Sequence, residues 1–175
     1  MPGEHAEELQ LLADVHQLLA DARVEHWLAG GWGIDFAVGR ITRRHMDIDF
    51  AIWKDDWRRV GDLLLKNSFD RQNNDFPEES RRVLKVECEI EFYLLQKTSN
   101  GEIIIGGRWV DWPFPKGSFG RTVGMIEGVT CPIMSLQGQL DSKEQWARQK
   151  HGGPLRDKDI ADIELLKKRL LGTKV

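Results

Sequence analysis

Cysteine is scarce in this sequence, and so is any surplus of positive charge. Only Cys88 and Cys131 occur, far apart and within apolar stretches. Their spacing gives neither a disulfide framework nor a cysteine metal motif, so we expect two buried thiols. The formal net charge is -3, which argues against a protein that wraps nucleic acid, because phosphate contacts need a basic face. Small molecules or proteins are the substrates that this charge favours.

Long apolar runs are missing as well. No stretch is long enough to cross a bilayer, and residues 1–10 are acidic and polar, unlike a signal peptide. We therefore expect a cytoplasmic protein without membrane contacts. Repeats and interdomain linkers are also absent, and 175 residues at 41% hydrophobic content suffice for one core. We predict a single domain over residues 1–175, with a sheet-containing core (1–133) and a helical C-terminal segment (134–175).

Two carboxylates share one face of a predicted strand. Asp47 and Asp49 alternate with Met46, Ile48 and Phe50, and this period-2 pattern is typical of a half-buried strand. Both aspartates then point the same way and repel each other unless a cation lies between them. Hard divalent ions prefer such oxygen ligands. The pattern therefore predicts a metal site at Asp47 and Asp49.

A double glycine precedes this strand. Residues 24–29 read as a short strand, Gly30 and Gly31 give the backbone freedom to turn, and residues 32–38 read as a helix that ends at Gly39. A glycine turn that leads into a helix N-terminus is suited to phosphate, because unpaired N–H groups and the positive end of the helix dipole coincide there. We expect phosphate and metal to meet at this point.

Further carboxylates follow in a second extended segment. Residues 81–95 look like one strand, in which Glu87, Glu89 and Glu91 alternate with apolar residues, and a turn over 97–101 leads to another strand over 102–105. One of these glutamates can complete the metal site.

The other elements follow from periodicity and turn residues. We expect amphipathic helices around residues 9–19, 55–66 and 135–150 and from Asp157 onward. We also expect a surface loop or a frayed edge over 69–80, and a hairpin of strands 122–126 and 129–133. The predicted fold class is α/β (α+β): a small mixed sheet flanked by helices, closed by the C-terminal helical segment.

The sequence around the glycines is similar to the sequences of a known family. It resembles the lincosamide and aminoglycoside (2″) nucleotidyltransferases, within the superfamily typified by DNA polymerase beta. The residues that carry the resemblance are Trp27, Gly30-Gly31-Trp32, Ile34-Asp35, Gly39-Arg40, Thr42-Arg43, His45 and Asp47-Ile48-Asp49. The resemblance implies the nucleotidyltransferase fold and a nucleotide site at Gly30, Gly31 and Trp32.

The same resemblance suggests further site residues. Glu91 aligns with a third carboxylate that is usually Asp in this family, and Glu89 is the second choice and a candidate general base. Arg43 and His45 match the family sequence, so they are candidates to bind the phosphates of the nucleotide. Residues 156–166 are similar to a closing motif of the family, which makes Lys158 a further candidate for the triphosphate.

The resemblance implies a metal-dependent transfer of AMP from ATP, or of another nucleoside monophosphate, to a hydroxyl of an aminoglycoside or lincosamide. One or two Mg²⁺ ions held by Asp47, Asp49 and Glu91 would neutralise the phosphates. A protein or RNA acceptor, and a non-catalytic nucleotide-binding relative, remain open alternatives. An acidic pocket of Glu78, Glu79, Glu87 or Asp111 would favour aminoglycosides, and apolar walls would favour lincosamides. A homodimer is also left open.

Other side chains have plainer interpretations. We expect Asp35 to pair with Arg40 or Arg43 and lock the loop, and His16 to be packed or solvated. The sequence holds 7 tryptophans. Trp109 and Trp112 are expected to pack in the core or clasp a loop, with stacking on a sugar or base as the alternative.

Overall fold

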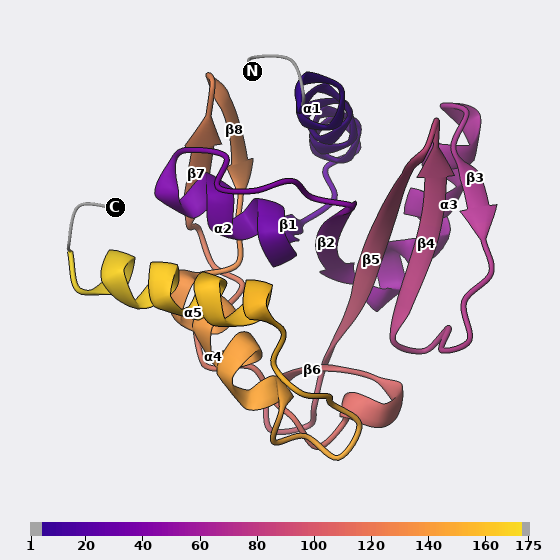
Figure 1. Cartoon of the computed structure of the whole chain (residues 1–175). Coiled ribbons are helices and arrows are strands. Elements are labelled where there is room, and N and C mark those ends of the chain that lie inside the picture. Colours follow the sequence, from indigo (N-terminus) through magenta and orange to yellow (C-terminus); the bar gives the residue numbers. More distant parts are fainter. Residues whose placement is uncertain (1–4, 173–175) are drawn as a thin grey trace.

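The computed structural model describes residues 5–172, and its centre is a six-stranded mixed sheet (Figure 1). The strand order is β1–β2–β5–β4–β3, and β6 pairs with β5. Strands β2 and β5 run parallel, whereas the other neighbours are antiparallel. The strands are β1 (His26–Ala29), β2 (Asp47–Trp53), β3 (Asp70–Gln72), β4 (Ser80–Lys85), β5 (Cys88–Lys97) and β6 (Ile103–Ile105).

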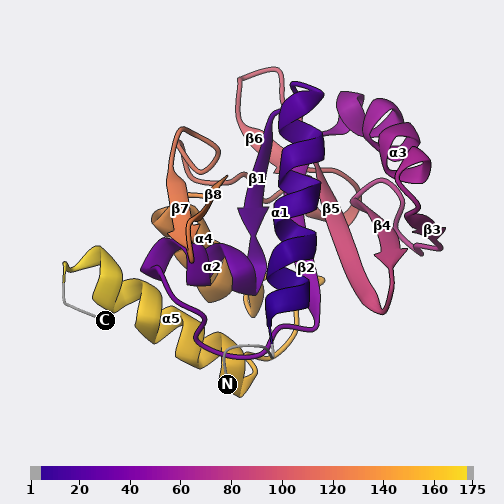
Figure 2. The same ribbon diagram turned by 90° about the horizontal axis from the view of Figure 1, so that it is seen from above.

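Helices α1 (Ala6–Asp21) and α3 (Trp57–Lys66) cover one face of this sheet (Figure 2). Their apolar stripes, including Leu12 of α1 and Leu64 of α3, join Phe50 and Phe92 of the sheet in the main core cluster. The period of about 3.6 residues in each helix places these side chains on a single stripe. A short 3₁₀ turn, η1 (Lys54–Asp56), leads into α3.

Helices α2 (Gly30–Val38), α4 (Leu136–Trp146) and α5 (Asp157–Leu170) form a second group. Ile34, Leu140, Ile163 and Leu166 are buried together between them. The hairpin of β7 (Val123–Ile126) and β8 (Val129–Pro132) forms a separate two-stranded sheet beside α2. Figure 1 shows α4 and α5 at the end of the molecule away from β3 and β4.

The predicted fold class is confirmed, and so are most predicted elements. Helix α2 ends at Gly39, which adopts a left-handed conformation with φ 82°. Ser135 caps α4 by accepting a hydrogen bond from the Gly138 backbone at 3.1 Å. Across residues 5–172, no helix combines the length and the apolar character that crossing a membrane requires.

Four sequence predictions were wrong in detail. Residues 81–95 are not one strand: a turn at Val86 and Glu87 separates β4 from β5, so Glu87 lies outside the strand face. The segment 69–80, predicted as a surface loop or a frayed edge, contains the exposed edge strand β3, so only the loop alternative was wrong. Helix α4 ends at Trp146, short of the predicted residue 150, and Arg156, one residue earlier than expected, is the N-cap of α5.

Candidate active site

The crossing from β1 to α2 forms the floor of the site. Gly30 begins α2 with φ 59°, and a side chain there would overlap the carboxylate of Asp49. At Gly31 a side chain would overlap the ring of His45. The N-cap residue Ala29 offers no side-chain cap to the helix. Both glycines are therefore required by close packing, and these first two residues of α2 line the cavity.

The cavity above this floor has a volume of about 760 Å³. Strands β1, β2 and β5, helices α2, α4 and α5, and the segment after β6 all contribute to its lining. Ligand pockets of small molecules commonly have volumes of roughly 300–1,000 Å³. The cavity is thus large enough for a nucleotide with part of a second substrate.

Three carboxylates lie on the cavity side of β2 and β5. Asp47, Asp49 and Glu91 all line the cavity. The parallel register pairs Asp49 with Glu91, so these two side chains leave the sheet in the same direction. Burial raises the pKa of Asp49 to about 7, the charges of Asp47 and Glu91 add to this, and Lys143 and Lys158 oppose it. Negative charge therefore exceeds what the surrounding protein neutralises.

This donor set fits a hard divalent cation such as Mg²⁺. Carboxylate oxygens are its preferred ligands, and the ion would relieve the repulsion that raises the pKa of Asp49. The Ser80 hydroxyl donates to Oε1 of Glu91 at 2.5 Å, and Nε of Arg82 lies 3.4 Å from the same oxygen. These two contacts hold the carboxylate of Glu91 in place at the cavity.

Glu89 occupies a different position. It pairs in register with Asp47, but its side chain is 40% exposed and lies 3.7 Å from Nε of Arg82, outside the cavity lining. Of the two predicted glutamates, Glu91 is therefore the one that the fold brings to the cavity.

Tyr93 is a cavity residue that the sequence interpretation missed. It is the only tyrosine in the sequence, it follows Glu91 on the same strand face, and it lines the cavity. The charge of Asp49, burial and the charges of Glu91 and Asp47 all raise the pKa of Tyr93. Its hydroxyl thus stays protonated and can donate a hydrogen bond. The alternation that identified Glu91 also indicated this residue.

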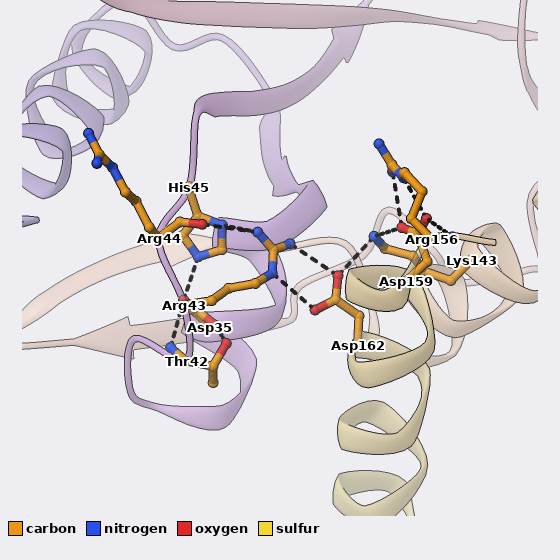
Figure 3. A network of polar contacts seen from close by, with 9 residues as sticks. All are labelled: Asp35, Thr42, Arg43, Arg44, His45, Lys143, Arg156, Asp159 and Asp162. Carbon is orange, nitrogen blue, oxygen red and sulfur yellow. Dashed lines mark hydrogen bonds and ion pairs between the residues drawn. The ribbon is translucent and has the colours of Figure 1, made fainter.

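Arg43 and His45 belong to a polar network behind the glycine turn (Figure 3). Arg43 donates to Nδ1 of His45 at 3.0 Å, so the other ring nitrogen, Nε2, carries the proton and donates to Asp35 at 2.6 Å. Asp35 also accepts from the backbone and hydroxyl of Thr42. The expected pairing of Asp35 with Arg40 or Arg43 was therefore wrong, although its structural role in the loop was right.

The network continues into the C-terminal helices. Nη2 of Arg43 lies 3.1 Å from Asp162, and Lys143 of α4 lies 2.9 Å from both Asp162 and Asp159. Arg156 completes it with a 2.7 Å contact to Asp159. In Figure 3 this line of alternating charges runs from the loop before β2 to α5. It fixes the helical segment against the glycine turn.

The predicted nucleotide residues separate into two groups. Gly30, Gly31, Arg43 and Lys158 line the cavity. His45 and Trp32 are buried behind it, with ring centroids 4.9 Å apart. Of the basic residues that line the cavity, Lys158 alone has no ion pair within residues 5–172. Its ammonium group can therefore bind an anion without first breaking an ion pair.

An aromatic wall closes the opposite side of the cavity. We define it as Trp109, Trp112, Phe114, Phe119 and Trp146, all of which line the cavity. Neighbouring rings contact one another, with centroids 5.8 Å apart for Trp109 and Trp112 and 5.2 Å apart for Trp109 and Trp146. Trp109 and Trp112 thus clasp the loop as expected and also present ring surface to the cavity.

Of the four residues predicted for an acidic pocket, Glu79 alone lines the cavity. Glu79 accepts hydrogen bonds from Arg108 and the Trp109 indole, and Glu78 pairs with Lys54 on the surface. Glu87 lies in the turn between β4 and β5, and Asp111 is exposed outside the cavity lining.

The sequence and the fold are similar to those of antibiotic-modifying enzymes. Over 40 residues, the chain is 50% identical to a 2″-aminoglycoside nucleotidyltransferase of Klebsiella pneumoniae and 47% identical to one of Escherichia coli. These segments span 21% of this chain and 23% of each relative.

Two solved structures share the fold over nearly the whole chain. ANT(2″)-Ia in complex with adenylyl-2″-tobramycin superposes with a TM-score of 0.75 at 16% identity, covering 94% of this chain and 90% of that one. Lincomycin-bound LnuA, a lincosamide antibiotic adenylyltransferase, superposes with a TM-score of 0.65 at 23% identity, covering 93% and 96%. The family model for aminoglycoside-2″-adenylyltransferase matches residues 11–166. The chain therefore belongs to the aminoglycoside-2″-adenylyltransferase family.

Proposed function

We propose that this protein is a metal-dependent adenylyltransferase that moves AMP from ATP to a hydroxyl group of a small antibiotic. The observation that carries the proposal is the placement of Asp47, Asp49 and Glu91 opposite the uncapped N-terminus of α2 in one cavity. Hard-cation ligands and a phosphate-binding helix end are the two parts that nucleotidyl transfer requires. Family membership supports the same reaction.

Asp47, Asp49 and Glu91 are the proposed ligands of one or two Mg²⁺ ions. When bound, the metal neutralises phosphate charge and favours ionisation of the acceptor hydroxyl. The N–H groups at the start of α2 and the side chains of Lys158 and Arg43 hold the phosphate oxygens. His45 and Asp35 position Arg43 through the hydrogen bonds described above and do not touch the nucleotide.

In the transfer step, the acceptor oxygen forms a bond to the α-phosphorus of ATP while the bond to the bridging oxygen breaks. Pyrophosphate leaves with the electron pair of that bond, toward Lys158 and the α2 N-terminus. When a single Mg²⁺ is held by Asp47 and Asp49, the proton of the hydroxyl passes to Glu91, because Glu91 lines the cavity while Glu89 lies outside it. When Glu91 instead holds a second ion, the hydroxyl ionises more readily and its proton passes to solvent. Tyr93 donates a hydrogen bond that orients the substrates.

The aromatic wall is the proposed acceptor site. Aromatic rings stack on sugar and apolar faces and also attract cations. Of the acidic residues expected to favour a polycation, only Glu79 lines the cavity, and it is paired with Arg108. The aromatic wall therefore favours an amphipathic acceptor of the lincosamide type, whereas family membership favours an aminoglycoside. Both remain within one reaction class.

We also propose how the chain is organised and where it acts. Residues 1–133 and 134–175 are proposed to act as one unit, because Lys143 and Lys158 face the same cavity as Asp49. Action in the cytoplasm, where ATP is available, is the proposed location.

Pyrophosphate release tests the function directly. The wild-type protein, Asp49→Asn and the surface control Asp62→Asn are incubated with each nucleoside triphosphate, Mg²⁺ and a panel of aminoglycosides and lincosamides. Release that needs one drug, ATP and an intact Asp49 supports the proposal and names the acceptor. Nucleotide binding without release across the panel would replace it with a protein or RNA acceptor or with a non-catalytic role.

A further inference from the structure

Three potential metal ligands from distant parts of the chain converge beneath the sheet. His16 comes from α1, His26 from the start of β1 and Cys131 from β8. One donor atom of each lies within 4.8 Å of the donor atoms of the other two. Neither His26 nor Cys131 stood out in the sequence, because nothing in their spacing indicates this contact.

This cluster lies on the face of the sheet opposite the carboxylates. The register pairs Ala29 with Asp49, and these paired residues share the cavity face. His26 lies three residues before Ala29 on β1, so strand alternation directs its side chain to the other face. The cluster is therefore a separate site and not an extension of the active site.

Hydrogen bonds already orient His26 as a ligand. Its Nδ1 lies 2.7 Å from the carbonyl oxygen of Val24, which can only accept, so Nδ1 carries the proton. The other nitrogen, Nε2, then presents a lone pair toward Nδ1 of His16, 2.7 Å away. Metal-binding histidines typically show this arrangement, in which one nitrogen donates to a carbonyl group and the other faces the metal.

Burial completes a suitable environment. Cys131 is 0% exposed and His26 is 5% exposed, whereas His16 is only half-buried. Burial lowers the pKa of His26 to about 4, so its ring is in the neutral form that binds metals. Burial also raises the pKa of the Cys131 thiol to about 12, so the thiol is unreactive unless a cation binds beside it. The half-buried His16 marks the side from which an ion and a water ligand can enter.

We propose that His16, His26 and Cys131 form a binding site for one Zn²⁺ or a similar borderline transition-metal ion, with water as the fourth ligand. Two imidazole nitrogens and one thiolate suit Zn²⁺, at bond lengths of about 2.0–2.1 Å and 2.3 Å. Donor atoms around such a tetrahedral ion lie roughly 3.3–3.7 Å apart. The two histidine nitrogens have to separate by about half an ångström from their present contact.

The site has a structural consequence. A bound ion links α1 and β8 to β1, the strand that leads directly into the glycine turn. The segment directly after β8 already contacts β1, because the backbone N–H of Met134 donates to the carbonyl oxygen of Leu28 at 2.9 Å. The ion therefore stabilises the scaffold of the active site from behind, and its removal lowers stability without removing any group that contacts substrate.

Cobalt binding tests the proposal, because a cobalt–thiolate bond has its own charge-transfer absorption in the near ultraviolet. Metal-free protein is titrated with Co²⁺ and then with Zn²⁺, and the chain offers a matched control in Cys88, which lies on β5 outside the cluster. We expect one Co²⁺ per chain with thiolate absorption in the wild type, in Cys88→Ser and in Asp49→Asn. We expect no such absorption in Cys131→Ser and at least tenfold weaker binding in His26→Gln.

Thermal unfolding gives a second readout. Zn²⁺ at 100 times its Kd should raise the Tm of the wild type and of Cys88→Ser by several degrees, and should not raise that of Cys131→Ser. Absence of thiolate absorption in the wild type overturns the proposal even if every variant fails to fold. Absorption that disappears in Cys88→Ser and persists in Cys131→Ser overturns it as well.

Discussion

The two faces of β1 and β2 present opposite donor chemistry. On the cavity face, Asp47 and Asp49 offer oxygen atoms beside an open space of about 760 Å³. On the core face, His26 offers nitrogen beside His16 and the sulfur of Cys131. Strand alternation separates the two sets by the thickness of one sheet. Exposed hard donors suit an exchangeable ion that serves chemistry, whereas buried soft donors suit an ion that serves stability.

Removal of one carboxylate should give the largest effect. Asp49→Asn is expected to lower kcat/KM on the order of 10³-fold, because a bound metal contributes several kcal/mol of transition-state stabilisation. The Tm without metal should stay constant or rise, since the substitution removes repulsion with Asp47 and Glu91. Activity assays and calorimetry with Asp62→Asn as the control check both parts. A large drop in Tm would mean that Asp49 is chiefly structural.

The metal response should separate the two faces. At a free concentration of 100 times its Kd, an ion raises the free energy of unfolding by about 2.7 kcal/mol. Stabilisation by Mg²⁺ with ATP should be lost in Asp49→Asn and kept in Cys131→Ser, and stabilisation by Zn²⁺ should show the reverse. Thermal unfolding of the four combinations measures this. A shared loss of both responses in either variant would break the comparison, because the faces would then not be independent.

Lys143→Met should destabilise the contact between the helical segment and the sheet. Lys143 bridges two buried aspartates, and removal of one partner from a buried ion pair costs about 3–5 kcal/mol. Asp159 and Asp162 keep Arg156 and Arg43, so we expect a loss of about 2 kcal/mol in the free energy of unfolding. Lys167→Met, which removes an exposed pair with Glu144, should change it by less than about 0.5 kcal/mol. Urea unfolding compares the two.

Acid should weaken the same contact. Burial by itself raises the pKa of Asp159, but hydrogen bonds from Arg156 and Lys143 outweigh it and hold this pKa below its ordinary value. Asp159 therefore binds a proton more readily in the unfolded chain than in the folded one. Its contribution to the free energy of unfolding is complete above the ordinary pKa of about 4 and is lost as the pH falls below that value. Between pH 5 and pH 3 the free energy of unfolding should fall in both proteins. This fall should be about 1 kcal/mol smaller in Asp159→Asn than in the wild type. An equal fall in both proteins would show that Asp159 does not cause the loss of stability in acid.

Local patterns predicted which side chains of β2 share the cavity face. The alternation of Asp47 and Asp49 with apolar residues, and the glycines around α2, depend on neighbours along the chain, which the sequence displays directly. The sequence did not predict the turn between β4 and β5, because no Gly, Asn or Pro marks it. The β-branched residue Val86 adopts φ 57° there. An apolar alternation that continues across such a turn is indistinguishable from one long strand.

Long-range partners could not be predicted. Arg43 and Asp162 are 119 residues apart, and only the packing of α5 against α2 brings them together. The same is true of Cys131 and the two histidines. Lys158 was found only through the family resemblance, because its sequence surroundings are those of any amphipathic surface helix.

The parallel pairing of β2 with β5 sets the separation of Asp49 and Glu91 through backbone hydrogen bonds, so no loop controls it. Most of the aromatic wall, by contrast, comes from the irregular segment over residues 106–119. In the proposed function, the reaction and the choice of acceptor are therefore encoded in separable parts of the chain. An engineered exchange of residues 106–119 would retarget the enzyme to a new hydroxylated molecule while leaving its phosphate chemistry unchanged.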